Sequence, residues 1–157
     1  MRGAPGTGSP DRVILAPLGE ADLDEVVQIE RDCFEMPWTR PMFAAELHKT
    51  IGRNYSARTS DGRMAGFLIA YAIADGGHLL NIAVRPEMRR SGIGRILLGY
   101  FIEVLRAEKM EAIYLEVRRS NAAAIELYKS FGLERIGTRY GYYENNGEDA
   151  IVMARKL

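Results

Sequence analysis

The chain has very few of the residues that form disulfides and metal sites. It contains one cysteine, Cys33, and two histidines, His48 and His78. A single cysteine excludes an internal disulfide and any zinc site with several cysteine ligands. The two histidines lie far apart in the sequence and form no ligand pattern. We therefore expect no metal, and we interpret Cys33 as a small apolar residue and both histidines as structural.

The chain also has no net charge and no long hydrophobic run. Its 21 basic residues balance its 21 acidic residues, which disfavours binding to nucleic acid or to a membrane through a broad basic surface. No apolar run approaches the ~20 residues of a membrane-spanning helix, and the N-terminus has no signal-peptide hydrophobic region. These observations predict a cytoplasmic protein.

Length and hydrophobic periodicity indicate the fold class. The chain has 157 residues, of which 47% are hydrophobic, so we expect a single domain over residues 12–157. Residues 1–11 are rich in Gly, Pro and Ser and are predicted to be a flexible tail. Strands are expected at 13–17, 55–59, 64–74, 78–84, 112–117, 133–143 and 150–154, and helices at 20–34, 39–48, 94–107 and 120–131. This order predicts an α/β protein, with a mixed sheet and helices on both faces.

The segment from Asn81 to Arg95 indicates a phosphate site. A short apolar run ends at Val84, a basic loop with two glycines follows, and an amphipathic helix then begins. The glycines allow the backbone to approach a ligand closely. The first helical turn supplies N–H groups and the positive end of the helix dipole. The loop lacks the third glycine of a dinucleotide-binding fingerprint and the Gly-Lys-Ser/Thr of a nucleoside-triphosphate loop. Four arginines surround it: Arg85, Arg89, Arg90 and Arg95.

Two motifs carry a resemblance to a known family. Arg89-Arg-Ser-Gly92-Ile-Gly94 resembles the Q/R-x-x-G-x-G/A diphosphate loop of the GNAT N-acetyltransferases. Tyr114–Leu133 resembles a later motif of that family, in which a strand runs into an Asn-Ala-x-Ala-x-x-Leu-Tyr helix and ends in a Phe/Leu-Gly-Phe/Leu turn. Leu133 stands where Phe is commoner. The resemblance implies the acyl-CoA N-acyltransferase fold and an enzyme that uses acetyl-CoA.

Further segments are similar to one group within that family, which acetylates the N-terminal alanine of a small-subunit ribosomal protein. The segments are Asn81–Val84, Leu115–Ile125, Tyr142-Tyr143, Glu148–Ala150 and Phe34-x-x-Pro37-Trp38. The resemblance therefore implies that the acceptor is a protein N-terminus and that the protein is a monomer or a weak dimer, without direct contact to nucleic acid.

The resemblance also implies the site residues. The strand backbone at Ile82, Ala83 and Val84 would hold the pantetheine arm, and Asn121 would bind the donor near its reactive end. Glu116 would be the general base, and Tyr128 the general acid, in contact with the donor. The diphosphate would be wrapped by Arg89, Arg90, Ser91, Gly92, Ile93, Gly94 and Arg95. The peptide would contact Phe34, Trp38, Glu116, Tyr140, Tyr142 and Tyr143.

General chemistry is consistent with these roles. An α-amino group with a pKa of about 8 is mostly protonated at neutral pH, but it loses its proton far more easily than lysine does. A carboxylate can accept that proton directly or through water, and a phenol can donate to the departing thiolate. Each residue also has an ordinary structural reading: Glu116 on a solvated strand face, Tyr128 and Trp38 in the core, Asn121 as a helix cap, and the three C-terminal tyrosines as strand aromatics.

Other functions fit the same motifs. A GNAT enzyme that acetylates small-molecule amines or lysine side chains would have the same donor loop. A non-catalytic module that binds acyl-CoA would also have it, although Glu116 and Tyr128 argue against that alternative. A third alternative is a subunit that needs a partner for activity.

Overall fold

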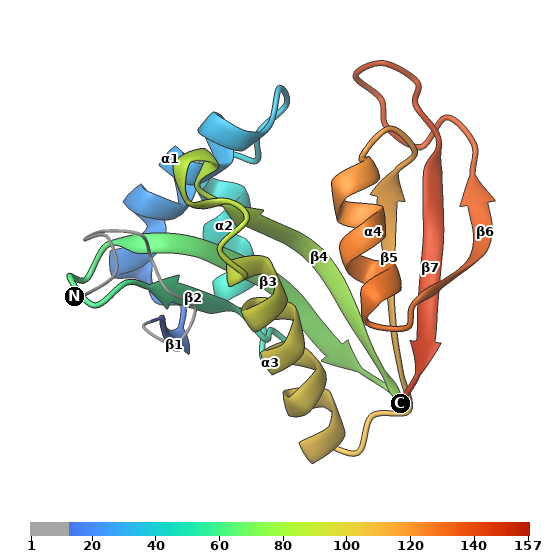
Figure 1. Cartoon of the computed structure of the whole chain (residues 1–157), viewed down its shortest axis with the longest axis horizontal. Helices are drawn as coiled ribbons and strands as arrows, with labels where there is room; N and C mark the ends of the chain where they lie inside the picture. Colours follow the sequence, from blue (N-terminus) through green and yellow to red (C-terminus); the bar gives the residue numbers. More distant parts are fainter. Residues whose placement is uncertain (1–12) are drawn as a thin grey trace, which may run out of the picture. The chain divides into compact units, whose positions relative to one another are not determined.

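The computed structural model describes residues 13–157 (Figure 1), so the predicted tail at 1–11 lies outside the described residues. The strands are β1 (Ile14–Pro17), β2 (Tyr55–Arg58), β3 (Met64–Ile73), β4 (Gly76–Val84), β5 (Ala112–Arg118), β6 (Glu134–Arg139) and β7 (Ala150–Lys156). The α-helices are α1 (Leu23–Cys33), α2 (Arg40–Leu47), α3 (Ile93–Ala107) and α4 (Ala122–Ser130). Short 3-10 turns lie at Glu20–Asp22 and Pro86–Met88. The predicted order of strands and helices is confirmed.

The strands form one mixed sheet in the order β1-β2-β3-β4-β5-β7-β6. β1, β2 and β3 pair antiparallel, and β7 pairs antiparallel with both β5 and β6. The parallel pairing is between β4 and β5, and its register runs from Gly76–Ala112 to Leu79–Leu115. The α/β fold class with a mixed sheet is therefore confirmed.

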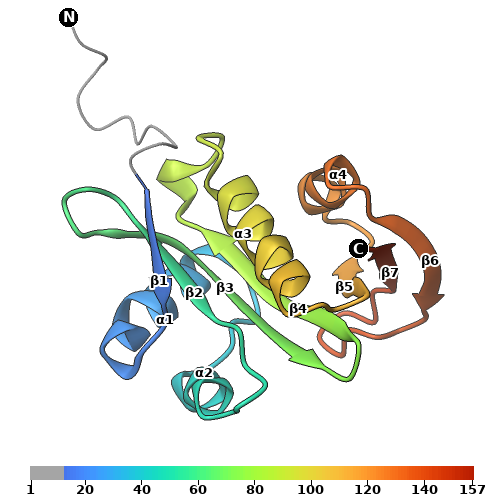
Figure 2. The same ribbon diagram turned by 90° about the horizontal axis from the view of Figure 1, so that it is seen from below.

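The chain forms two compact units. Unit 1 contains residues 13–69 and 81–98, and unit 2 contains residues 70–80 and 99–157. In unit 1, α1 and α2 lie on one face of β1, β2 and β3, and the start of α3 lies on the other (Figure 2). α1 buries Leu23, Val26 and Ile29 at helical spacing. α2 packs through Phe43, whose ring meets Phe67 of β3 edge-on at 5.5 Å.

Unit 2 combines β5, β6 and β7 with α4 and the later turns of α3. A Cβ at Gly77 would overlap the side chain of Leu105, so glycine lets α3 pack directly on the start of β4. α4 ends in a Schellman motif: Leu133 N–H donates to the Tyr128 carbonyl, and Gly132 N–H donates to the Lys129 carbonyl. Gly132 has the left-handed φ of +83° that this ending requires.

Several predicted boundaries differ from the structure by one or more residues. The strand expected at 133–143 is wrong beyond Arg139, because Gly141 and Gly147 have left-handed φ values of +61° and +71° and the chain turns. The strand expected at 78–84 begins earlier, at Gly76, after a tight turn in which Ala74 has a φ of +56°. The helix expected at 120–131 begins at Ala122. Among residues 13–157, no helix has both the length and the apolar composition needed to cross a bilayer.

Candidate active site

The loop between β4 and α3, in unit 1, has the backbone geometry expected of an anion site. Arg90 and Gly92 both have left-handed φ values, +64° and +85°, and α3 begins directly after them at Ile93. The Ser91 hydroxyl donates to the Met88 carbonyl and braces the turn. The first N–H groups of a helix have no intrahelical acceptor, so the Ile93, Gly94 and Arg95 amides lie where an anion is stabilised.

Arg85 does not belong to this loop's basic rim, contrary to the sequence interpretation. Its side chain is buried, and its Nε donates to the Met64 carbonyl at 2.6 Å. Its Nη2 atom lies 3.8 Å from Oε2 of the Glu25 carboxylate. Arg85 therefore fixes β4 to the start of β3, while Arg89, Arg90 and Arg95 are exposed.

The end of β4 holds the three residues predicted to bind the pantetheine arm. Ala83 is buried, and Ile82 and Val84 are half-buried. The Val84 carbonyl already accepts hydrogen bonds from Cys33 Sγ at 3.3 Å and from Arg89 Nε at 3.4 Å. Burial raises the pKa of the Cys33 thiol, which keeps it protonated and unsuited to act as a nucleophile.

A buried carboxyl group orders the segment predicted to contact the peptide. Glu30 is 2% exposed. Its oxygens accept hydrogen bonds from the Trp38 backbone N–H at 3.0 Å and from Asn81 Nδ2 at 2.8 Å, and burial raises its pKa. Trp38 is half-buried against Phe43, with ring centroids 5.2 Å apart, so it is partly a core residue.

Phe34 is exposed and is available to a ligand. The sequence reasoning did not assign a role to Glu30 or Asn81. The signal for Glu30 was its position on the apolar stripe of α1, where a charged residue is unusual.

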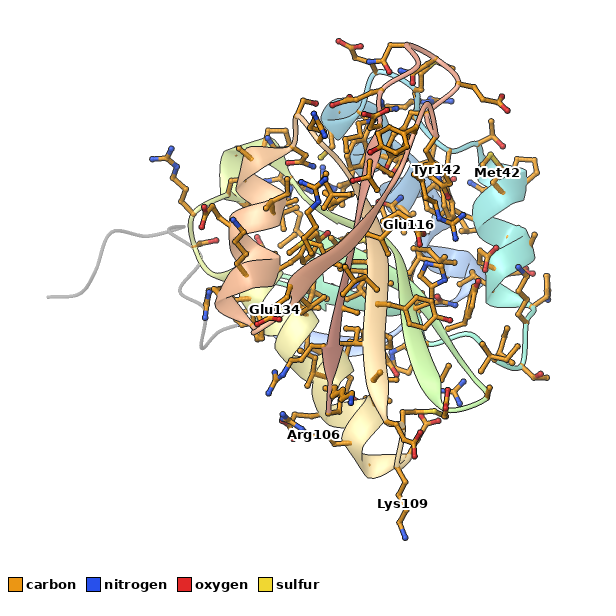
Figure 3. All side chains as sticks on the ribbon, turned by 90° about the vertical axis from the view of Figure 1, so that its right-hand side faces the viewer. Met42, Arg106, Lys109, Glu116, Glu134 and Tyr142 are labelled. Carbon is orange, nitrogen blue, oxygen red and sulfur yellow. The ribbon has the colours of Figure 1, made fainter. Side chains whose placement is uncertain are left out.

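In unit 2, Glu116 lies on β5 (Figure 3), and its side chain forms a hydrogen-bonded pair with His78. His78 Nε2 on β4 lies 2.9 Å from Glu116 Oε1, and the side chains are only 15% and 11% exposed. The hydrogen bond from His78 is the largest cause of a lowered pKa for Glu116, and the positive charge of Arg139 acts in the same direction. Glu116 is therefore ionised at neutral pH, and it is not simply a residue on a solvated face.

Tyr128 lies on α4 and has both structural and chemical features. It is 5% exposed, and burial raises the pKa of its phenol well above its usual range, with a smaller contribution from Tyr143. The phenol therefore stays protonated and can donate.

Asn121 is the N-cap of α4. Its Oδ1 accepts a hydrogen bond from the Ala124 N–H at 3.2 Å. The capping role that the sequence allowed is therefore present, and the side-chain amide nitrogen remains as a possible ligand donor.

The three C-terminal tyrosines lie in the connection that follows β6 and not in a strand. Tyr140 is 81% exposed, and Tyr142 and Tyr143 meet edge-on at 5.0 Å. Tyr143 is half-buried, and burial raises its pKa to about 12. Arg118 lies over its ring at 3.9 Å.

Arg118 is a functional candidate that the sequence reasoning missed. Its guanidinium donates to Asn145 at 2.8 Å and to Asn146 and Glu148, each at 3.3 Å. Glu148 in turn accepts from the Ser120 N–H at 2.6 Å. The connection between β6 and β7 is thus tied to the end of β5 by one arginine.

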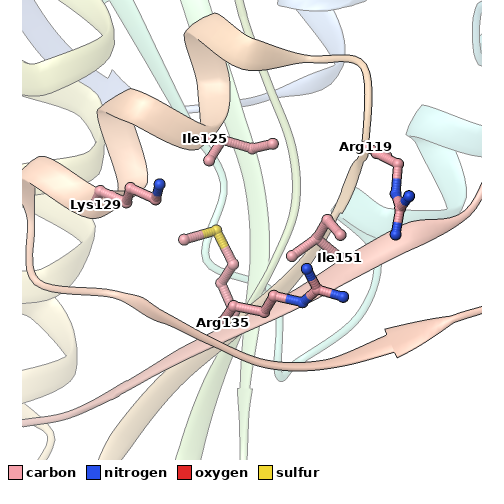
Figure 4. A pocket seen from close by; sticks show the side chains of 6 residues that line it. Arg119, Ile125, Lys129, Arg135 and Ile151 are labelled. Carbon is pink, nitrogen blue, oxygen red and sulfur yellow. The ribbon is translucent and has the colours of Figure 1, made fainter.

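Two further observations concern metal ligands and pockets. Residues 13–157 contain no group of three or more His, Cys, Asp or Glu side chains placed to hold a metal ion. A shallow pocket of about 410 Å³ in unit 2 contains none of the predicted site residues (Figure 4). It is lined by Arg119, Ile125, Lys129, Arg135, Ile151 and Met153.

Comparison with known proteins identifies the family to which this fold belongs. Residues 23–133 match the model of the acetyltransferase (GNAT) family, and the chain belongs to that family. The ribosomal protein bS18 alanine N-acetyltransferase of Escherichia coli is 38% identical over 142 residues, covering 89% of this chain and 95% of that protein. The protein of the same name from Salmonella typhimurium is 40% identical over 141 residues, covering 87% and 93%.

Solved structures show the same relationship. The crystal structure of the Escherichia coli S18 alanine N-acetyltransferase has a TM-score of 0.85 and 37% identity, covering 92% of this chain and 94% of that one. Arabidopsis thaliana NAA60 in complex with acetyl-CoA has a TM-score of 0.82, covering 92% and 98%, and at 18% identity it shows a shared fold alone.

Proposed function

We propose that this chain is an N-terminal protein acetyltransferase of the RimI type. It transfers acetyl from acetyl-CoA to the α-amine of an N-terminal alanine, and the acceptor is a small-subunit ribosomal protein. The observation that carries this proposal is the 38–40% identity to enzymes named for that reaction, across nearly the whole chain. A cytoplasmic location follows from the proposed acceptor, since ribosomal proteins are made there.

The donor is proposed to bind to unit 1. The left-handed turn at Arg90 and Gly92 exposes the amides at the start of α3, which suit a diphosphate. Arg89, Arg90 and Arg95 supply the compensating positive charge. Within the described residues, the register between β4 and β5 ends at Leu79, which leaves Ile82 and Ala83 without a β5 partner. An extended pantetheine arm can therefore bond to their backbone as an added strand would.

Proton transfer is proposed to use unit 2. The Glu116 carboxylate accepts the proton of the substrate ammonium, and the amine lone pair then attacks the thioester carbonyl. The C–S bond breaks as Tyr128, which burial keeps protonated, donates its proton to the departing sulfur. The attacking nitrogen loses its second proton as the amide forms, and that proton restores the Tyr128 phenol. No covalent acetyl-enzyme is required, consistent with the protonated Cys33 thiol.

The acceptor peptide is proposed to contact Phe34 and Trp38 in unit 1 and Tyr140, Tyr142 and Tyr143 in unit 2. Phe34, Tyr140 and Tyr142 are exposed and Trp38 and Tyr143 are half-buried, and aromatic side chains provide contact area at a low cost in conformational entropy. The Glu30 and Arg118 hydrogen bonds hold these two segments.

The proposed reaction is tested by mass spectrometry. The purified chain is incubated with acetyl-CoA and a synthetic peptide that begins with Ala and contains an internal Lys. One added acetyl group, located by fragment ions on the α-amine, is expected. Acetylation only at the Lys side chain, or only of small amines, would instead show that the chain is a GNAT enzyme with a different acceptor.

Glu116→Gln and Tyr128→Phe are each expected to lower turnover of that peptide by about 10²–10⁴-fold, because each removes one side of the proton transfer. Glu126→Gln, on the exposed surface of α4, is the matched control and is expected to leave turnover unchanged. Steady-state rates at saturating acetyl-CoA measure the effect. Rates within about 2-fold of wild type in either variant would exclude that residue from the mechanism.

A further inference from the structure

His78, which forms a hydrogen bond with Glu116, is as informative about the site as Glu116 itself. Register pairs His78 with Tyr114, and Glu116 lies two residues further along β5, so all three side chains share one face of the sheet. The Nε2–Oε1 distance of 2.9 Å is a full hydrogen bond. Because the Glu116 carboxylate can only accept, His78 must present a protonated Nε2.

Aromatic rings hold the imidazole in this orientation. The His78 ring lies 4.6 Å from that of Tyr114 and 5.4 Å from that of Tyr71, between centroids. Packing against two rings restricts the rotamer of His78 and therefore the direction of its N–H. The titratable and charged groups around the pair come from several elements of unit 2. Tyr71 and Tyr114 lie against His78, and Arg139, Tyr114 and Tyr143 interact electrostatically with Glu116. Asp75 acts on Tyr114.

We propose that His78 is a positioning residue for Glu116: it aims the carboxylate while it is neutral, and it switches this base off when it is protonated. The proposal rests on the proposed role of Glu116 as proton acceptor. His78 occupies Oε1, so Oε2 is the oxygen left to take the proton from the substrate ammonium. The sequence reading of His78 as purely structural is thereby replaced with a functional one.

The switch follows from the charge of the imidazole. A neutral His78 donates one ordinary hydrogen bond to Glu116. A second proton, taken at Nδ1, converts this bond into an ion pair. The carboxylate is then a poorer base for the ammonium, and catalysis slows.

Two substitutions separate the orientation of the Glu116 carboxylate by His78 from the effect of protonating His78. His78→Gln keeps an N–H donor and does not titrate, while His78→Leu removes both properties. At pH 8 we expect the Gln variant to keep kcat within about 3-fold of wild type, and the Leu variant to lose about 10-fold or more in kcat with little change in KM for the Ala peptide. Equal activity of wild type and the Leu variant would overturn the proposal.

The pH dependence provides the sharper readout. The ratio of wild-type to Gln-variant kcat is expected to fall as the pH is lowered from 8 to 5.5, because only wild type can form the ion pair. Titration of the peptide amine cancels in this ratio. His48→Gln is the matched control, since His48 is exposed, and its ratio to wild type should stay flat. A flat ratio for His78→Gln would overturn the switch.

A measurement that does not depend on turnover tests the hydrogen bond between His78 and Glu116 separately. Carbon-detected NMR follows the Glu116 carboxyl, identified by the signal lost in Glu116→Gln. Its pKa should rise in His78→Leu and stay low in His78→Gln. An unchanged pKa in the Leu variant would overturn the pairing. If the Glu116 pKa rises in His78→Leu but wild type transfers no acetyl group, the hydrogen-bonded pair is supported. The proposed function is then rejected, and the proposed switch is rejected with it.

Discussion

At the residue scale, a hydrogen bond sets the protonation state of Glu116 and burial sets that of Tyr128. Glu116 and Tyr128 lie in the same unit, and their environments shift their pKa values in opposite directions: the carboxyl loses its proton more easily, and the phenol keeps its proton. Glu116 is therefore ready to accept a proton and Tyr128 to donate one, as their proposed roles require. Tyr143 interacts electrostatically with both.

The buried Glu30 predicts an unusual pH dependence of stability. Its pKa is raised in the folded state, so the unfolded chain loses this proton at a lower pH than the folded chain. The contribution of Glu30 to stability is therefore present in acid and is lost as pH rises through the folded pKa. The unfolding free energy of wild type minus that of Glu30→Gln should fall as pH rises from about 4 to 8. Urea titrations measure it, and a difference that grows with pH would contradict the interpretation.

At the scale of elements, local patterns predicted the strands and helices, but not the contacts between them. Alternation and helical periodicity lie within each segment, so the order of elements could be read directly. The bond between His78 and Glu116 joins residues 38 positions apart, and no local pattern indicates it. The course of the chain after Arg139 was missed because Gly141 was not recognised as a left-handed position.

The middle of α3 predicts a stabilising substitution. A Cβ at Gly99 would lie 3.6 Å from Phe131, which is ordinary van der Waals contact. Gly99→Ala should therefore raise the unfolding free energy by about 1 kcal/mol, because alanine favours the helix and fits the space. Gly77→Ala is the contrasting variant and should destabilise, since its Cβ would overlap Leu105. Chemical denaturation compares the two, and a destabilised Gly99→Ala would show that Phe131 cannot accommodate a methyl group.

The connection between β6 and β7 predicts an effect confined to the acceptor. Arg118→Ala removes the hydrogen bonds to Asn145, Asn146 and Glu148 and the contact with Tyr143. We expect KM for the Ala peptide to rise about 10-fold while KM for acetyl-CoA stays unchanged, because only the peptide-contacting segment is loosened. The peptide KM of Arg118→Lys should lie between those of wild type and Arg118→Ala, since lysine keeps the charge and loses the forked donor geometry. Equal changes in both KM values would contradict this assignment.

At the scale of the whole molecule, the two units carry different parts of the proposed reaction. Unit 1 contains the turn proposed to hold the diphosphate, and unit 2 contains the proposed base and acid and the residues that contact them. The turn before α3 could be predicted because its glycines, its arginines and the following helix are contiguous in sequence. The inward turn of Arg85 was not, because only the fold shows that Met64 and Glu25 lie beside it.

The most direct test of the central claim is calorimetric titration of the purified chain with acetyl-CoA. Wild type should bind one equivalent, and Gly92→Ala should bind about 10-fold more weakly, because a Cβ at a φ of +85° strains the turn by about 1–2 kcal/mol. Gly62→Ala carries the same strain at a φ of +88° in the β2–β3 turn and should bind as wild type does. No binding by wild type, or equal affinity in all three proteins, would contradict the account.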